Sequence, residues 1–122
     1  TQSPTFKHFS TAFKAATGRE PETFAAASYD MVICLALALQ AAGAEATPAQ
    51  IASKIRTVAE EPGKKVSSFA EGRDLLLKGE KIDFDGASAP LTFTPEGRST
   101  PDFGVYEFQK DKLVLKEVIR LT

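Results

Sequence analysis

The side chains that could carry out chemistry are few and lie far apart along the chain. His8 is the only histidine and Cys34 the only cysteine, so a zinc site of the usual His/Cys kind is not expected. His8 lies beside an aromatic stripe, where a surface or half-buried structural role is expected. Cys34 is expected to be a small buried hydrophobe rather than a reactive thiol, and no disulfide can form within the chain.

Two acidic segments have a weak resemblance to functional motifs. The segment Asp83-Phe84-Asp85-Gly86 looks like part of a calcium loop, but the EF-hand pattern then places Lys81 and Thr92 at its first and twelfth positions. Neither residue suits those positions, so the segment is predicted to be a turn whose aspartates bond to local backbone. The pair Tyr29-Asp30 could be functional, although local hydrogen bonds near a helix start are the favoured interpretation.

Motifs of catalysis and of cofactor binding are missing from the sequence. There is no Gly-x-Ser-x-Gly elbow and no GxGxxG or GxxxxGK[ST] array. Residue types alone leave Ser-His-Asp catalysis open, but nothing in their spacing supports it. The sequence therefore predicts no enzyme, no cofactor and no metal site.

Composition and charge narrow the class of partner. The chain has 122 residues, 43% of them hydrophobic and 25% charged, which is typical of one ordinary globular domain. Fifteen basic and sixteen acidic residues give a net charge of -1, so no nucleic-acid partner is expected. The N-terminal Thr-Gln-Ser-Pro lacks a charged and apolar leader, so no export signal is expected in this chain.

The central element is predicted to be a long helix over residues 21–43. Pro21 suits a first turn, Glu22 complements the positive end of the helix dipole, and Gly43 can end the helix. One apolar stripe is expected at spacings of three and four residues: Phe24, Ala27, Met31, Cys34, Leu35, Ala38 and Ala42.

The middle of this helix is apolar on every side. Such a helix must be covered from several directions, or it leaves an apolar patch of the kind that marks an interface. The run of residues 31–39 between Asp30 and Gln40 is too short for a membrane span, which needs about 20 residues. We therefore expect no span, and we expect contact with the remainder of the same protein or with another copy.

Three further helices are predicted over residues 4–16, 48–59 and 69–78, and two strands over 103–109 and 112–121. Ser3, Thr47 with Gln50, and Ser68 with Glu71 are the expected N-terminal caps. Lys64 and Lys65 are assigned to a solvated loop, and Lys110 and Asp111 to the turn of a hairpin. Taken alone, the chain has an α+β order of four helices followed by a β-hairpin.

Several stretches, taken in order, resemble a known family. They are Gly18-Arg19-Glu20-Pro21-Glu22-Thr23-Phe24, then Ala27 to Val32, Ser68 to Gly72, Ile82 to Phe93, Glu96-Gly97 and Gly104-Val105-Tyr106. In this order the chain closely resembles the C-terminal third of type I periplasmic solute-binding proteins of ABC importers, in the branched-chain amino acid family. The resemblance covers essentially the whole chain.

The resemblance implies an α/β parent fold. Its two lobes would each hold a parallel sheet with helices on both faces, joined by three crossover strands, with the ligand in the cleft between them. Residues 1–100 would form part of lobe I. Residues 101–122 would form a crossover and the C-terminal hairpin of lobe II.

The resemblance also implies a function. The chain would be a solute-binding component of an ABC importer, or a C-terminal fragment of one, that binds a small apolar or aromatic amino acid or a related carboxylate. Its partners would be this ligand and the importer permease, and its location periplasmic or extracytoplasmic. Phe24 would line the ligand's apolar side chain, and a purely structural role in the core is the competing interpretation. A ligand-sensing domain of the same fold in a regulator or receptor is the alternative function.

Overall fold

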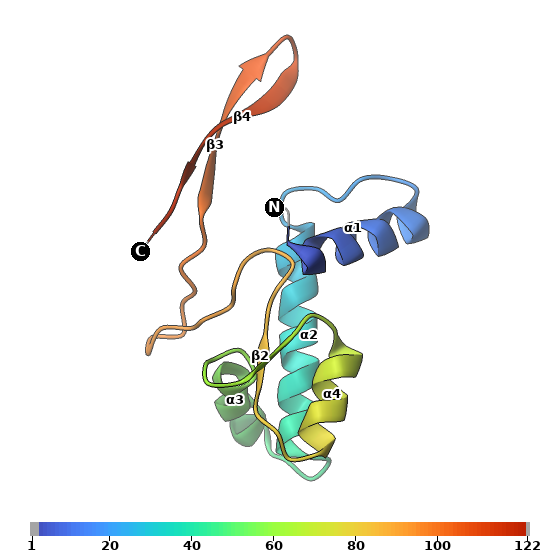
Figure 1. Cartoon of the computed structure of the whole chain (residues 1–122), viewed down its shortest axis with the longest axis vertical. Coiled ribbons are helices and arrows are strands. Elements are labelled where there is room, and N and C mark those ends of the chain that lie inside the picture. The colour runs from blue at the N-terminus through green and yellow to red at the C-terminus, as the bar shows by residue number, and fades with distance from the viewer. Residues whose placement is uncertain (1–2, 122) are drawn as a thin grey trace.

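The structure is a computed structural model that describes residues 3–121 (Figure 1). Its elements are α1 (Pro4–Thr17), α2 (Ala25–Ala42), α3 (Pro48–Thr57), β1 (Lys64–Val66), α4 (Phe69–Leu77), β2 (Ile82–Phe84), β3 (Phe103–Gln109) and β4 (Lys112–Ile119). The predicted order of four helices and a C-terminal hairpin is confirmed. A short parallel pair of strands, β1 and β2, was not predicted.

Three of the helices begin at their predicted caps. The Ser3 hydroxyl accepts a hydrogen bond of 3.1 Å from a first-turn N–H of α1, and Thr47 and Gln50 form a reciprocal capping box at the start of α3. The Ser68 hydroxyl accepts from the N–H of Glu71 in α4. These bonds satisfy N–H groups that have no partner inside the helix.

The start of α2 differs from the prediction. Glu22 to Ala25 form a turn in which the Ala25 N–H donates to the Glu22 carbonyl at 3.0 Å, and the helix begins at Ala25 with Phe24 at its N-cap. Pro21 is equally compatible with an extended segment, and residues 18–24 carry the chain from the end of α1 to the head of α2. The predicted end is confirmed, because Gly43 follows the helix with a φ of 93°.

The two sides of α2 also differ from the predicted stripe. The buried side consists of Ala26, Asp30, Cys34, Leu37 and Ala38. The opposite side, which we call the outer stripe, consists of Met31, Val32, Leu35 and Leu39, with exposed fractions of 52% to 73%. The predicted stripe mixed these two sides because nearly every position is apolar, so periodicity cannot select the buried one.

The middle of the chain forms a βαβ unit. Strands β1 and β2 pair in parallel, with Lys64 opposite Ile82 and Val66 opposite Phe84, and α4 connects them. The predictions of a solvated loop at Lys64 and Lys65 and of a turn around Phe84 were therefore wrong. Strands of three residues are too short to show an alternating pattern.

Charge pairing also explains the lysines of β1. The Lys65 Nζ lies 2.6 Å from an oxygen of the buried Asp83 carboxylate on the neighbouring strand. Lys64 pairs in the same way with Glu80, just before β2. Both lysines thus stabilise the parallel pair while their stems remain exposed to solvent.

The main core lies between α2, α3, α4 and the two short strands. Its buried members are Cys34, Leu37, Ala38, Val58, Ala59, Val66, Ile82 and Phe84. Figure 1 shows α3 and α4 beside the lower half of α2, while α1 crosses near its upper end. A second cluster of Phe9, Ala26 and Ala87 holds α1 there.

The hairpin of β3 and β4 confirms its predicted turn and corrects its predicted end. Lys110 and Asp111 both have positive φ, 48° and 64°, as the favoured two-residue hairpin turns require. The second strand ends at Ile119 rather than at residue 121.

The hairpin carries an apolar face on the side of Tyr106. The extra residue of the bulge is Lys116 of β4, because Val105 pairs with Glu117 and Tyr106 with Leu115, so β3 keeps its regular alternation. A Cβ at Gly104 would lie 2.7 Å from the Tyr106 ring and 3.0 Å from Leu115 Cδ1, so Gly104 lies on the same side as these two residues. The apolar face on this side consists of Tyr106, Phe108, Leu113, Leu115 and Val118.

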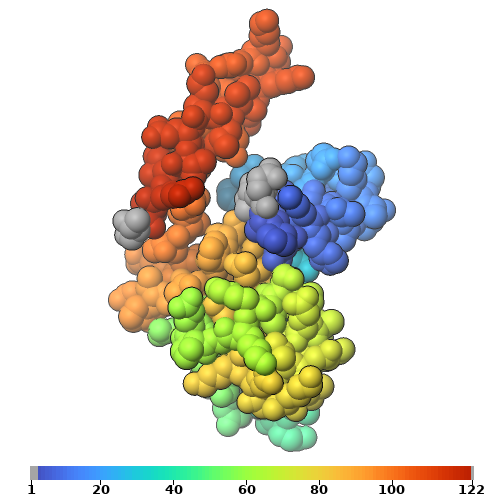
Figure 2. Space-filling model, in the orientation of Figure 1, coloured from blue at the N-terminus to red at the C-terminus, as the bar shows by residue number. Residues whose placement is uncertain are grey.

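Figure 2 shows the hairpin as an arm that projects from the helical body. Every residue of β3 and β4 is exposed, so the apolar hairpin face lacks cover within the described chain. The outer stripe of α2 is uncovered as well, which confirms the predicted apolar patch.

Helix α2 is long and apolar enough to cross a membrane by length and composition alone. Its buried side, however, packs against α3, α4 and β2 and carries the hydrogen-bonded carboxylate of Asp30. These contacts favour the core helix predicted from the sequence.

Candidate functional site

The carboxyl ends of β1 and β2 meet at one edge of the parallel pair. Ser67 and Ser68 follow β1 and lead into α4, while residues 85–88 follow β2. In open α/β sheets ligands bind outside the carboxyl ends of the strands. The first turns of α2 lie at this same edge, because Asp30 is bonded to the loop that follows β2.

Asp30 ties α2 to that loop through three hydrogen bonds. Its Oδ1 accepts from the Ala87 N–H at 2.7 Å, and its Oδ2 accepts from both the N–H and the hydroxyl of Ser88. The Asp30 side chain is 1% exposed, and a carboxylate is tolerated at such depth only with partners of this kind. The expectation of local bonds for Asp30 was wrong, since its partners lie 57 and 58 positions along the chain.

Gly86 makes this approach possible. A Cβ at this position would lie 2.6 Å from Asp30 Oδ2 and 2.7 Å from the Ala89 carbonyl oxygen, closer than side chains pack. An aspartate inside an apolar helix was the one sequence signal for this tie. No sequence pattern indicated that Ala87 and Ser88 would bond to Asp30.

Two neighbours of Asp30 have altered acidity. Burial, and then the negative charge of Asp30, raise the pKa of the Cys34 thiol to about 11. The same two causes raise the pKa of Tyr29. Cys34 is therefore a neutral thiol, with its Sγ 3.6 Å from the Ile55 carbonyl oxygen, as expected for a buried hydrophobe.

An aromatic cluster anchors α1 across the head of α2. The rings of Phe9 and Tyr29 lie 4.9 Å apart between centroids, and Phe9 is also 5.7 Å from Phe13. Phe6, 6.3 Å from Phe9, extends the cluster toward the carboxyl edge. The predicted aromatic stripe of α1 is thus part of the second core cluster.

Phe24 lies at the head of α2, as predicted, but is not part of the core. Its side chain is 78% exposed and lines a shallow hollow of about 420 Å³ together with Phe13, Arg19 and Ser28. The competing interpretation of Phe24 as a core residue therefore gains no support from the described chain. Its role as a ligand wall stays a prediction.

A second hollow, which we call the carboxyl-edge pocket, measures about 400 Å³. Its lining comes from α1, the α1–α2 loop, the head of α2, the loop after β2 and the hairpin: Phe6, Pro21, Glu22, Thr23, Ala26, Ser88, Tyr106 and Leu113. Sequence reasoning had singled out none of these residues as binding residues. Only the fold brings them together.

The head of α2 adds an electrostatic feature to this pocket. The helix has no side-chain hydrogen bond at its N-cap and no acidic residue in its first turn. Such a helix end presents free N–H groups and the positive pole of the dipole, both of which favour an anion.

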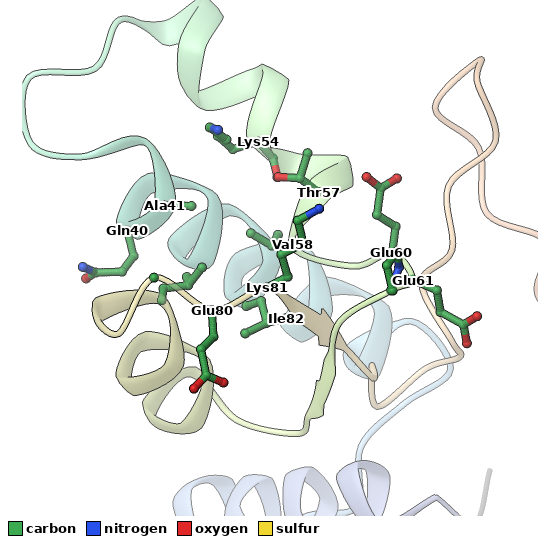
Figure 3. A pocket seen from close by; sticks show the side chains of 13 residues that line it. Gln40, Ala41, Lys54, Thr57, Val58, Glu60, Glu61, Glu80, Lys81 and Ile82 are labelled. Atoms are coloured by element: carbon green, nitrogen blue, oxygen red, sulfur yellow. The ribbon is translucent and has the colours of Figure 1, made fainter.

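Another hollow of about 370 Å³ lies at the opposite, amino-end edge of the strands (Figure 3). Its charged lining includes Glu60, Glu61 and Glu80 together with Lys54 and Lys81. Figure 3 shows the three carboxylates pointing in different directions, and the described residues contain no group of His, Cys, Asp and Glu that could hold a metal ion. We therefore take the carboxyl-edge pocket as the candidate site.

Comparison with known families decides the class of this protein. Residues 1–111 match the ANF receptor family, the receptor family ligand binding region. The chain belongs to this family. No curated protein and no solved structure gave a match.

Family membership confirms the coarser part of the resemblance. The family has the type I periplasmic-binding-protein fold, its members are binding domains without catalytic function, and they take a small-molecule ligand. A pocket built of wall residues and polar contacts, rather than of catalytic groups, agrees with this class.

Proposed function

We propose that the chain belongs to the solute-binding component of an ABC importer, located in the periplasm or another extracytoplasmic space. Its ligand is a small apolar or aromatic amino acid or a related carboxylate, and its protein partner is the importer permease. Family membership supports ligand binding. The importer role rests on the sequence resemblance described above.

The observation that carries this proposal is the construction of the carboxyl-edge pocket. Phe6, Ala26 and Leu113 offer apolar walls, and the uncapped head of α2 offers N–H groups for a carboxylate. Asp30 holds the loop bearing Ser88 in a fixed position beside them. This combination suits a ligand with an apolar body and an acidic group.

The two parts of the chain agree with the proposed division into lobes. Residues 1–100 would belong to lobe I, and residues 101–122 would be a crossover and the hairpin of lobe II. Between the helical body and the hairpin, residues 94–102 include Pro95, Gly97 and Pro101 and hold no helix or named strand. A segment of this kind suits a connection between lobes.

Calorimetric titration of the chain tests the proposed ligand class. L-leucine and L-phenylalanine are expected to bind saturably, whereas D-ribose, which has neither an apolar side chain nor a carboxylate, is expected not to bind. Binding of the sugar, or absence of binding by both amino acids, would contradict the proposal.

Phe24 tests whether the ligand also reaches the neighbouring hollow, which shares Glu22 and Thr23 with the carboxyl-edge pocket. Phe24→Ala should weaken binding of an apolar amino acid by roughly 1–3 kcal/mol, the usual scale for loss of a buried side-chain contact. Met31→Ala is the matched control, because Met31 is an equally exposed apolar residue of α2 outside both hollows. Calorimetry showing equal affinities for the two variants would remove Phe24 from the site.

A ligand-sensing domain of a receptor or regulator is the second candidate function. The description of the family as a receptor ligand-binding region favours it. Ligand-dependent capture of an ABC permease from membranes would support the importer. Ligand-dependent activation of a signalling domain on the same polypeptide would support the sensor.

A further inference from the structure

The two edges of the hairpin differ in their protection against further strand pairing. Strand β4 begins at Lys112, has Lys116 at its bulge and is followed by Arg120. Lysines and bulges are devices by which proteins protect an exposed strand edge. The seven residues of β3 include neither, and their one charge, on Glu107, is paired with Lys116 at 2.9 Å. The outer edge of β3 is therefore the unprotected one.

The backbone of β3 has hydrogen-bonding groups on this outer edge. The two-residue turn makes Gln109 and Lys112 a hydrogen-bonded pair, so Gln109 directs its N–H and C=O groups toward β4. Alternation along β3 then directs the same groups of Gly104, Tyr106 and Phe108 away from β4. The described chain places no strand against them.

A second copy of β3 matches this edge when the two strands run antiparallel about Tyr106. In that register Tyr106 lies opposite Tyr106 of the second copy, and Gly104 lies opposite Phe108. All three residues direct their backbone groups outward, so every such pair can form the two bonds of a hydrogen-bonded pair. The contact is symmetric, as in most homodimers.

The side chains are compatible with the same register. The Tyr106 ring leans over Gly104, 2.7 Å from where a Cβ would lie, so Phe108 of the second copy meets an aromatic ring beside the glycine. Aromatic pairs across strands are stabilising. Glu107 lies opposite Val105 of the second copy, so no like charges face each other.

We propose that the outer edge of β3 is a dimerisation surface and that its partner is β3 of a second copy, paired antiparallel about Tyr106. The two hairpins then form a single four-stranded sheet with a continuous apolar face. A two-stranded hairpin alone is marginally stable, whereas three or more strands with an apolar face can be stable. This inference goes beyond ligand binding and does not depend on the identity of the ligand.

A charge exchange at Tyr106 tests the symmetry of the contact. Analytical ultracentrifugation of the full chain should show a dimer with twice the 13.1 kDa mass of one chain. Tyr106→Lys should raise the dissociation constant roughly tenfold, because it removes an aromatic pair and sets two like charges opposite each other. An equimolar mixture of Tyr106→Lys and Tyr106→Glu should restore the dimer, because lysine then faces glutamate.

Leu115→Lys is the matched control. Leu115 pairs with Tyr106 on the same apolar face but lies on β4, so its lysine would not meet its counterpart in the dimer. This variant should keep the dissociation constant of the unmodified chain. Repeating the series with Leu35→Lys and Leu39→Lys removes association through the outer stripe of α2, and circular dichroism establishes that each variant folds.

The outcomes decide the proposal. It is overturned if Tyr106→Lys dimerises as tightly as the unmodified chain, if Leu115→Lys weakens the dimer equally, or if the mixture of lysine and glutamate variants stays monomeric. A chain with the outer stripe replaced that is monomeric at its highest soluble concentration also overturns it, because a second copy then does not occupy the edge of β3. The proposed function is tested separately by calorimetry, so it can fail or stand independently of these results.

Discussion

At the scale of single residues, the Asp30 carboxylate determines the environment of the helix head. It is buried, accepts three hydrogen bonds from one loop, and raises the pKa of two neighbours. Its hydrogen bonds join α2 to residues that lie 57 and 58 positions away in the sequence. Removing its charge should therefore affect both stability and acidity.

Asp30→Asn should destabilise the fold by about 1–3 kcal/mol. The amide keeps one acceptor oxygen, but its NH₂ group then faces donors on Ser88, so at least one buried donor loses its partner. Urea denaturation followed by circular dichroism measures the change, with Asp74→Asn as a control at an exposed carboxylate. Equal stability of the two variants would show that the tie contributes nothing.

Cys34 should make stability fall in alkaline solution. Its thiol has a usual pKa of 9.0 and a folded-state pKa of about 11, so between these values the folded state binds more protons than the unfolded state. Stability from this group is complete below pH 9 and is lost as the pH rises through 11, by on the order of 2 kcal/mol. Denaturant titrations at several pH values should show a shallower decline for Cys34→Ala, and parallel declines would refute the assignment.

At the scale of elements, close approach explains why α4 packs against α2. Gly72 is buried in α4, and a Cβ there would lie 2.6 Å from Leu37 Cδ2 and 3.3 Å from Ile82 Cδ1. The Leu37 side chain of α2 therefore occupies the space that a larger residue at position 72 of α4 would need. This contact holds the βαβ unit to the central helix.

Gly72→Ala should therefore destabilise the chain despite the better helix propensity of alanine. The added methyl group forces Leu37 out of its position, which costs about 1–3 kcal/mol, against a gain of roughly 1 kcal/mol from propensity. Thermal unfolding is the measurement, with Ser53→Ala on an exposed face of α3 as the control. A higher melting temperature for Gly72→Ala would show that the contact relaxes freely.

Elements with strong local signals were predictable from the sequence, and elements defined by distant partners were not. The caps at Ser3, Thr47 and Ser68 and the turn at Lys110 reflect local chemistry, so the sequence alone located them. Strands β1 and β2 form because they pair with one another and pack against α2, and no short window of sequence reveals such distant partners. Phe24 was placed correctly at the head of α2 because the signals for that helix are local. The partners of Asp30 were missed because they lie far away in the sequence.

At the scale of the whole molecule, two apolar surfaces remain uncovered in the described chain. They are the outer stripe of α2 and the apolar face of the hairpin. Surfaces of this kind mark sites of contact with other protein. They agree with the expected contact with the remainder of the same protein or with another copy.

The chain alone should therefore bind an apolar dye or self-associate. Replacing Leu35 and Leu39 of the outer stripe with lysine should reduce both effects without lowering stability, because both side chains are already half exposed. Light scattering and dye fluorescence measure the outcome. A monodisperse 13.1 kDa monomer without dye binding would contradict the expectation.

The tie between Asp30 and Ser88 also has a consequence during synthesis. A ribosome adds about 5–20 residues per second, so roughly 3–12 seconds separate the emergence of this carboxylate from that of its donors 58 positions later. Throughout that interval the nascent α2 lacks its polar anchor, and for most of it α2 also lacks β2, which precedes Ser88 by only a few residues. The most apolar helix of the chain therefore stays exposed until the last residues of its core have been synthesised. At this stage the nascent chain offers a chaperone its largest apolar surface.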